Sequence, residues 1–388
     1  MSRLVAVVLL AIAGIAHAGV ADTFKPNRSE KQRLKLMSKP EKWFLKNLAG
    51  PREVIDGQLL DPKLQWYLEG RRLRSAEDVR RGLDMFLSPQ ARAAKRDALA
   101  REWTLLTKVT ASMRSMEQRA IPGPGGPIPI HIYTPQTEEQ GPLPVLLYFH
   151  DGSWLYGGIE AVDRTVRLIA NEAQVIVISV DYRLAPEHPW PAANDDGEAA
   201  FLWARANAAS FGGNPEMIAV GGAGAGGNIA MVVSHRQHHA GRPIPLYQLL
   251  YYTALDYSPL YESSQLFAQG YGLDATFRDF VLSTVYPDPA TAERAVKELR
   301  KTKMEKMPAT IVVTAGFDML RDPGQSLARR MEKAGTAVTY LNYPSLIHGF
   351  LQWSGVVEDA ERAAVESARL FGNAVRHRQA LLSSNPYK

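Results

Sequence analysis

Four short segments of the chain carry the residue types that could do chemistry. They are His150–Trp154, Gly222–Asn228, Gly316–Asp318 and Leu346–Phe350. Each follows a short apolar run, and open α/β sheets bind their ligands at the carboxyl ends of such strands. The histidine and aspartate side chains among them suit acid–base chemistry, provided that the fold brings them together.

Several other kinds of chemistry are excluded by composition. The chain has no cysteine, which excludes disulfides, a cysteine nucleophile, Fe–S clusters and cysteine-based zinc sites. The neighbouring pair His238-His239 is poorly placed to bind one ion, and no other spacing suggests metal ligands. We therefore expect neither a metal nor another cofactor.

The elements that must position these segments alternate between apolar runs and helical stretches. The runs are rich in β-branched and aromatic residues and lack period-two alternation, which is typical of strands buried on both faces. They span Ile128–Tyr133, Val145–Phe149, Val175–Val180, Met217–Gly221, Leu246–Tyr252, Thr310–Ala315 and Ala337–Tyr343. The pattern predicts a mostly parallel sheet flanked by helices, in one large α/β domain from 116 to 378.

The segment before this domain, 19–115, is predicted to be a helical extension or cap, and residues 379–388 a C-terminal tail. The chain carries a formal net charge of +5, and residues 19–120 hold 22 Lys and Arg against 13 Asp and Glu. These charges lack the clustering expected of nucleic-acid binding, so no nucleic-acid partner is predicted. Docking on an anionic surface or polymer and a solvated helical face both remain interpretations of this segment.

Residues 1–18 have the layout of a secretory signal peptide. A start containing Arg3 precedes an apolar run, and Ala16-His17-Ala18 offers a small-residue cleavage site. The apolar run is shorter than the ~20 residues needed to span a bilayer. We expect cleavage after Ala18 and a periplasmic or secreted protein.

Longer strings in the α/β region resemble the hormone-sensitive-lipase-like esterases of the α/β-hydrolase fold. They occur in the family's order over roughly residues 115–375, and the preceding helical segment matches the family's cap. The strings are Ile121–Pro124, Asp181–Pro189, Gly270–Leu273 and Gly316–Asp322. The resemblance implies this fold and carboxylic-ester hydrolysis by a serine on a sharp strand–turn–helix elbow, written G-x-S-x-G.

Carried over residue by residue, the resemblance places the orienting acid on Asp318 and the base on His348. The elbow is where this chain departs from the family, because Gly222-x-Gly224-x-Gly226 puts glycine at the serine position. Ala223 also replaces the acid that usually precedes the serine. Glycine has no side chain to attack an ester, although it adopts the strained elbow conformation easily.

A second departure lies in the loop that would stabilise the oxyanion. The family has H-G-G-G, and this chain has His150-Asp151-Gly152-Ser153. An inward carboxylate on Asp151 would oppose an oxyanion by ~4 kcal/mol at close range, unless it is protonated or turned outward. Backbone donors at Asp151, Gly152 and Ala225 remain available for a neutral carbonyl or a carboxylate.

Three residues are weighed as substitutes for the missing serine. Ser153 lies in the oxyanion loop and Ser345 precedes the base by three positions, so neither stands on the elbow. Asp151 could instead help His348 to activate water.

These observations leave three functional hypotheses. The first is a pseudoenzyme that keeps the esterase pocket to bind a small ester or carboxylate. The second is an active ester hydrolase that uses His348 and Asp318 by an unconventional route. The third is a structural subunit that docks through the basic segment 19–115. The oligomeric state is left open.

Overall fold

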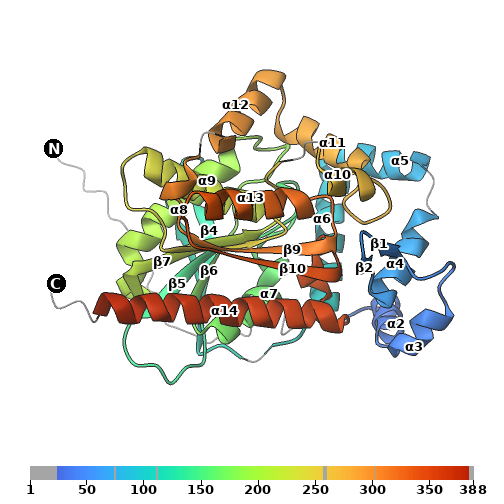
Figure 1. Ribbon diagram of the computed structural model, residues 1–388, viewed down its shortest axis with the longest axis horizontal. Coiled ribbons are helices and arrows are strands. Elements are labelled where there is room, and N and C mark those ends of the chain that lie inside the picture. Colours follow the sequence, from blue (N-terminus) through green and yellow to red (C-terminus); the bar gives the residue numbers. More distant parts are fainter. Residues whose placement is uncertain (1–23, 74–75, 111, 257–259, 301, 384–388) are drawn as a thin grey trace, which may run out of the picture.

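The computed structural model describes residues 24–73, 76–110, 112–256, 260–300 and 302–383. Its centre is an eight-stranded sheet in the order β10-β9-β8-β7-β5-β6-β4-β3 (Figure 1). The strands are β3 (Ser115–Ile121), β4 (Ile128–Thr134), β5 (Leu143–Phe149), β6 (Ile176–Val180), β7 (Gly213–Ala223), β8 (Tyr247–Tyr251), β9 (Ala309–Phe317) and β10 (Val338–Ile347). All neighbours from β10 to β6 pair in parallel, and only β4 pairs antiparallel with its neighbours. The predicted mostly parallel sheet is confirmed.

Each of the seven predicted strands is present, with its ends shifted by a few residues. The eighth strand, β3, was missed, and the region predicted as helical therefore ends one residue into it. Its sequence Ser-Met-Glu-Gln-Arg-Ala-Ile has no apolar run, and only Ile121 is fully buried. Because β3 is the edge of the sheet, its exposed face needs no hydrophobic residues, and the pattern used for buried strands does not detect it.

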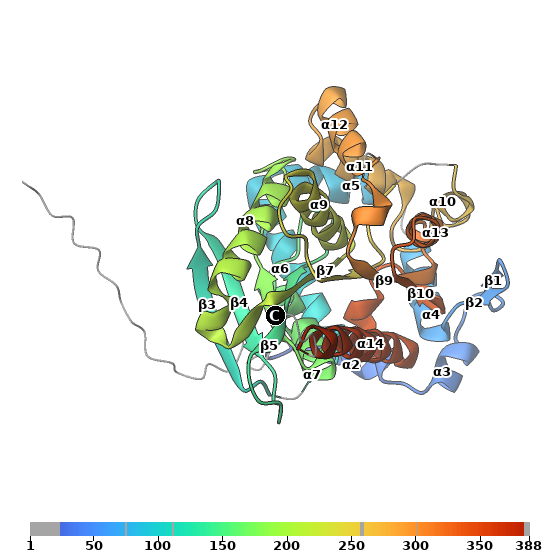
Figure 2. The same ribbon diagram turned by 60° about the vertical axis from the view of Figure 1, so that its left-hand side comes forward.

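Helices cover both faces of the sheet, as predicted. On one face lie α7 (Ile159–Ala173) and α14 (Glu358–Ser383), which also contact each other, and on the other lie α8 (Ala192–Asn207), α9 (Ala225–His239) and α13 (Arg321–Lys333) (Figures 1 and 2). Strands β5 and β6 are buried at every position because both of their faces are covered. The helix α14 runs five residues into the predicted tail. None of the described helices is both long and apolar enough to cross a membrane.

The N-terminal segment is helical apart from one small hairpin that sequence analysis did not predict. Its helices are α2 (Arg28–Met37), α3 (Glu41–Lys46), α4 (Pro62–Arg72), α5 (Ala76–Leu87) and α6 (Pro89–Leu106). The hairpin pairs β1 (Val54–Ile55) with β2 (Gln58–Leu59). Its turn, Asp56-Gly57, has positive φ at both residues, and such a dipeptide is a strong hairpin signal.

This hairpin lies against the carboxyl ends of β9 and β10 (Figures 1 and 2). The Gln58 amide donates to the Gly316 carbonyl at 3.3 Å and accepts from Asn342 at 2.9 Å. Arg321 forms an ion pair of 2.9 Å with Asp56. The N-terminal segment therefore supports the two strand ends that lead to Asp318 and His348.

A second helical insertion, between β8 and β9, shares the capping role that was predicted for the N-terminal segment alone. It contains α10 (Glu262–Leu266), α11 (Ala275–Val285) and α12 (Pro289–Arg300). The two insertions meet where Phe86 of α5 packs edge-on against Phe280 of α11, with ring centroids 6.1 Å apart. The predicted signal peptide, residues 1–18, lies outside the described residues, and its cleavage stays a prediction.

Candidate active site

The elbow is formed where β7 passes into α9, and Gly224 is the residue at the turn. Its backbone has φ +51° and ψ −115°, a combination that residues with a side chain rarely adopt. Its N–H donates to the Tyr251 carbonyl and its carbonyl accepts from Ala254, both at 3.0 Å. The turn is therefore held by backbone contacts that do not depend on a side chain at Gly224.

The outer two glycines of this motif are required for close packing. A Cβ atom on Gly222 would lie 2.5 Å from the Phe149 carbonyl oxygen, and one on Gly226 would lie 2.0 Å from the same atom. Gly224 is different, because a Cβ atom there would meet nothing closer than 3.3 Å. Of these three glycines, only Gly224 therefore leaves space for a side chain.

Asp318 and His348 form the hydrogen bond expected of an acid–base pair. Asp318 follows β9 and is 1% exposed, while His348 follows β10 and its side chain is 18% exposed. The His348 Nδ1 atom lies 2.8 Å from Asp318 Oδ2, and Asp318 Oδ1 accepts from the Leu320 N–H at 2.9 Å. Burial disfavours the charged imidazole, but the carboxylates of Asp318 and Asp151 outweigh it and raise the pKa of His348.

The other ring nitrogen of His348 is directed at the elbow. His348 Nε2 lies 3.7 Å from the position that a Cβ atom on Gly224 would occupy. A hydroxyl oxygen one bond farther on would be within hydrogen-bonding reach of this nitrogen. The predicted positions Gly224, His348 and Asp318 are thus brought together in the order that a nucleophile, base and acid require.

Asp151 points inward, and its carboxylate is buried beside the elbow. The residue is 4% exposed, and its Cβ atom lies 3.3 Å from the Cβ position on Gly224. Its Oδ2 atom accepts hydrogen bonds from the Gln352 amide at 2.6 Å and the Tyr252 hydroxyl at 3.3 Å. Its Oδ1 atom is buried and has no hydrogen-bond partner. Burial raises the pKa of Asp151, against the lowering effect of these two donors and of His348.

The loop around Asp151 keeps a tight glycine-dependent conformation. Gly152 has φ +117°, and a Cβ atom there would lie 1.9 Å from the Tyr156 carbonyl oxygen. His150 stacks on Tyr182 with ring centroids 4.2 Å apart, and its Nδ1 atom bonds the Asp151 carbonyl oxygen at 2.6 Å. Burial lowers the pKa of His150 to about 4, so this histidine is neutral and structural. Gly152 and His150 thus hold the backbone of this loop in place, and Asp151 adds a carboxylate to it.

Ala225 completes the predicted set, because it is the first residue of α9 and follows the elbow directly. The positive end of the α9 dipole is therefore located at the site, where it favours a negative charge. The two serines weighed as substitutes are engaged elsewhere. The Ser345 hydroxyl donates to Asp359 of α14, and that of Ser153 bonds Tyr156.

Sequence reasoning missed two residues that hold Asp151, namely Tyr252 and Gln352. Tyr252 follows β8, and its ring packs edge-on against His348 with centroids 4.9 Å apart. Gln352 lies in the turn after His348 and is buried. The one available signal was a lone amide within the apolar string Phe-Leu-Gln-Trp, since a buried amide requires a polar partner.

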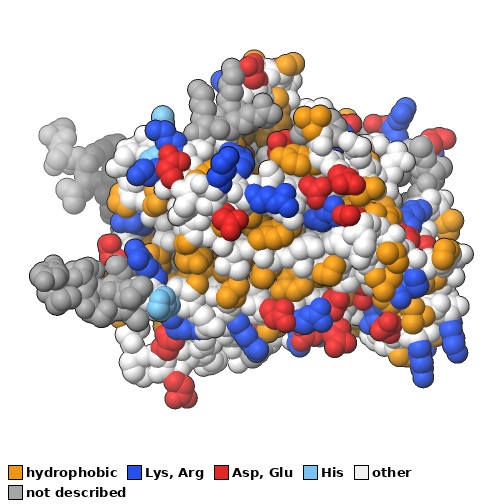
Figure 3. All heavy atoms as spheres, in the orientation of Figure 1, with side chains coloured by type: hydrophobic (Ala, Val, Ile, Leu, Met, Phe, Trp, Pro, Cys, Tyr) orange, Lys and Arg blue, Asp and Glu red, His pale blue; other side chains and the backbone are white. Residues whose placement is uncertain are grey.

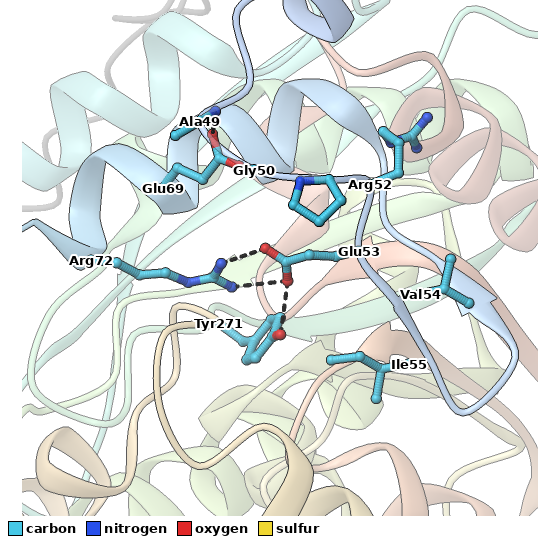
Figure 4. Close-up of a pocket in the computed structure, with 10 residues that line it drawn as sticks. Ala49, Gly50, Arg52, Glu53, Val54, Ile55, Glu69, Arg72 and Tyr271 are labelled. Atoms are coloured by element: carbon cyan, nitrogen blue, oxygen red, sulfur yellow. Dashed lines mark hydrogen bonds and ion pairs between the residues drawn. The ribbon is translucent and has the colours of Figure 1, made fainter.

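One hollow on the described surface lies away from this constellation. It has a volume of about 570 Å³ and is formed by the chain between α3 and α4, the end of α4 and Tyr271 (Figure 4). In Figure 4, Arg72 and Tyr271 converge on Glu53, whose Oε2 atom accepts from the Tyr271 hydroxyl at 2.8 Å. These contacts join the N-terminal segment to the second insertion, and none of the predicted site residues lines the hollow.

Comparison with known proteins shows that the chain is similar to ester hydrolases. The family model for the alpha/beta hydrolase fold matches residues 146–352. The carboxylic ester hydrolase LipN of Mycobacterium tuberculosis is 35% identical, over 78% of this chain and 80% of LipN. An arylesterase of Saccharolobus solfataricus is 32% identical, over 58% of this chain and 73% of that protein.

Solved structures agree with this assignment. An ester hydrolase from the metagenome of Lake Arreo, solved with a phosphonate derivative, superposes with a TM-score of 0.74 at 35% identity. The match covers 81% of this chain and 99% of the chain of that enzyme. The hyperthermophilic esterase of Pyrobaculum calidifontis gives a TM-score of 0.71 at 28% identity, over 81% of this chain and 99% of its own.

Proposed function

Because the chain belongs to the alpha/beta hydrolase fold family, among the hormone-sensitive-lipase-like esterases, we propose that it binds a small ester without forming an acyl-enzyme. The observation that carries the proposal is Gly224 in the elbow conformation, with His348 Nε2 facing the place where a serine would stand. Neither Ser153 nor Ser345 replaces the missing hydroxyl there, because Ser345 donates to Asp359 and Ser153 bonds Tyr156. In a serine hydrolase, loss of the nucleophile costs on the order of a million-fold in turnover.

The charge of the site supports the same proposal. Asp151 places a buried carboxylate where an esterase stabilises a negative oxygen, so a developing oxyanion is opposed by ~4 kcal/mol at close range and moderate dielectric. Asp151 and Asp318 also raise the pKa of His348, which lowers the share of neutral imidazole that can act as a base. Of the two ligand classes expected from sequence, a neutral ester fits this charge better than a carboxylate.

A second candidate function is ester hydrolysis through activated water. The observation in its favour is the Oδ1 atom of Asp151, which is buried beside the elbow without a hydrogen-bond partner. A water molecule in the space left by the missing side chain would lie between this oxygen and His348 Nε2. Such a route predicts slow turnover that requires both Asp151 and His348, and no labelled serine.

The docking hypothesis finds less support in the charges of the N-terminal segment. Several of its basic side chains are paired with acids, and basic and acidic groups are interspersed on the face shown in Figure 3. The pairs are Arg33–Glu102, Arg72–Glu53, Arg92–Glu187, Arg96–Glu187 and Arg101–Glu30. An anionic polymer would have to displace these acids from the basic side chains in order to bind there. Because an exposed ion pair contributes little free energy, such an exchange would give little net attraction.

A labelling experiment tests the proposal directly. A fluorophosphonate probe followed by peptide mass spectrometry is expected to modify no serine, and p-nitrophenyl butyrate is expected to hydrolyse at the uncatalysed rate. Ethyl butyrate is expected to raise the Tm, whereas butyrate is not. Stoichiometric labelling of a serine would overturn the proposal. Turnover lost in both Asp151→Asn and His348→Ala would instead establish the water route.

A further inference from the structure

A cavity of about 300 Å³, here called the side chamber, lies between α8, α9, α12 and α13. This volume is at the small end of the range for ligand pockets, ~300–1,000 Å³. Most of its wall is apolar, with main contributions from Met231, Val232, Leu282, Leu299, Met304 and Leu327. Such a wall suits the apolar body of a small molecule.

The side chamber adjoins the candidate active site. Trp154, which lines it, lies three residues after Asp151 in the oxyanion loop. Asn228 and Ala254 also line it, and the Asn228 amide donates to the Ala254 carbonyl at 2.8 Å. The Ala254 N–H in turn donates to the carbonyl of Gly224. The chamber and the elbow therefore share a wall.

Three residues that line the side chamber carry a buried polar atom without a hydrogen-bond partner. They are Trp190 with Nε1, Asn194 with Oδ1 and Glu298 with Oε2. Leaving one such group unpaired costs ~1–3 kcal/mol, and buried polar groups are normally paired. Asn194 is 3% exposed, so its unpaired amide oxygen is removed from bulk water. Three such groups around one cavity suggest that the partner is a ligand.

Acidic groups outnumber basic ones by one at the chamber, counting the ion cluster around Glu298 and the lining residues Asp256 and Arg330. The Oε1 atom of Glu298 accepts from Arg236 Nε at 2.7 Å, but Arg236 also pairs with Asp195 at 2.7 Å and Glu198 at 3.4 Å. Even with Arg242, which pairs with Glu198, this cluster has three carboxylates and two guanidinium groups. The free Oε2 of Glu298 is thus an acceptor that favours a donor with positive charge.

We propose that the side chamber binds the apolar body of a small ligand whose polar end donates hydrogen bonds to Glu298 and Asn194. An ammonium group is preferred to a hydroxyl, because a charged donor forms the stronger hydrogen bond to a carboxylate oxygen. The inference stands apart from the proposed function, because none of Asp151, Gly224 and His348 lines the chamber. Glu298 and Asn194 then determine which small molecules the chamber accepts.

Calorimetric titration with three probes of similar size tests the proposal. 2-Phenylethylamine is expected to bind more tightly than 2-phenylethanol, and propylbenzene more weakly than both. Glu298→Gln is expected to weaken the amine about tenfold and to leave propylbenzene unchanged. Glu293→Gln, an exposed acid on the same helix, is the matched control and is expected to change neither affinity.

Because Glu298 also pairs with Arg236, a second variant lies outside the ion cluster. Asn194→Leu is expected to weaken the amine and to strengthen propylbenzene. The proposal fails if the amine binds no more tightly than propylbenzene, or if Glu293→Gln weakens it as much as Glu298→Gln does. Neither result changes the expected outcome of the fluorophosphonate experiment. A failure of this proposal can therefore be told apart from a failure of the proposed function.

Discussion

The two halves of the candidate active site match the family's catalytic pattern to different extents. The acid–base half, Asp318 with His348, keeps its hydrogen bond of 2.8 Å and its orientation toward the elbow. The other half has the elbow backbone conformation, but it carries glycine at Gly224 and a buried carboxylate at Asp151 where the family pattern has serine and glycine. On the proposed function, the side chains that would act on a substrate depart from the family pattern, whereas the framework that would position them is present.

The contacts around each half explain how this is possible. The elbow conformation is imposed by backbone bonds from Gly224 and by the close packing of Gly222 and Gly226. The acid–base half is supported from outside by the β1–β2 hairpin through Gln58. Neither support involves a side chain at Gly224, so the proposed loss of chemistry requires no loss of structure.

The largest expected effect comes from restoring the altered half. Gly224→Ser alone adds a hydroxyl near His348 but leaves the Asp151 carboxylate against it, so we expect little gain. The double change with Asp151→Gly removes this charge and the 3.3 Å contact together. We expect its kcat/KM on p-nitrophenyl butyrate to exceed that of Gly224→Ser about 10²–10³-fold, the range associated with an oxyanion interaction.

Adding His348→Ala to the double variant tests whether the conserved half is functional, and is expected to return the activity to that of the unmodified protein. Equal activity in Gly224→Ser and the double variant would show that Asp151 does not oppose the oxyanion. Inactivity of both would show that the comparison between halves is incomplete and that the pocket itself has diverged.

A smaller effect is expected on stability, and it separates backbone strain from crowding at the elbow. Gly224→Ala puts a Cβ on a positive-φ residue and against Asp151, and is expected to lower the free energy of unfolding by about 2 kcal/mol. Gly335→Ala is the matched control, with φ +77° but open space around it, and is expected to cost about 1 kcal/mol. In the Asp151→Gly background the two costs should become equal. Denaturant unfolding of each variant and its parent measures these costs. Unequal costs in the Asp151→Gly background would contradict the prediction.

The smallest effect tests the electrostatic link between the halves. The Asp151 carboxylate is one cause of the raised pKa of His348, although Asp318 is the larger charged cause. Asp151→Asn keeps the shape and removes the charge, so the pKa of His348 should fall, and a larger neutral fraction should be present near pH 7. An NMR titration of the His348 ring measures this change, with Asp318→Asn expected to lower the pKa further. An unchanged pKa of His348 in Asp151→Asn would show that the two halves are not electrostatically coupled.

Sequence alone identified the family, the parallel sheet and the order of the four site segments. Long motif strings and buried apolar strands are local features, so Gly224, Asp318 and His348 could be placed from them. The edge strand β3 and the support from Gln58 could not be placed, because neither depends on a local hydrophobic pattern. The side chamber was equally beyond reach, since its walls come from helices far apart in the chain.

The orientation of Asp151 illustrates the same division most clearly. The sequence determined that a carboxylate replaces a glycine in the oxyanion loop, and left open whether it turns inward or outward. Tertiary structure decided the question, because Tyr252 and Gln352 from two other strand ends converge on one of its oxygens. The burial of a side chain and its hydrogen-bond partners depend on residues that are distant in sequence. Only the folded chain brings these residues to one place.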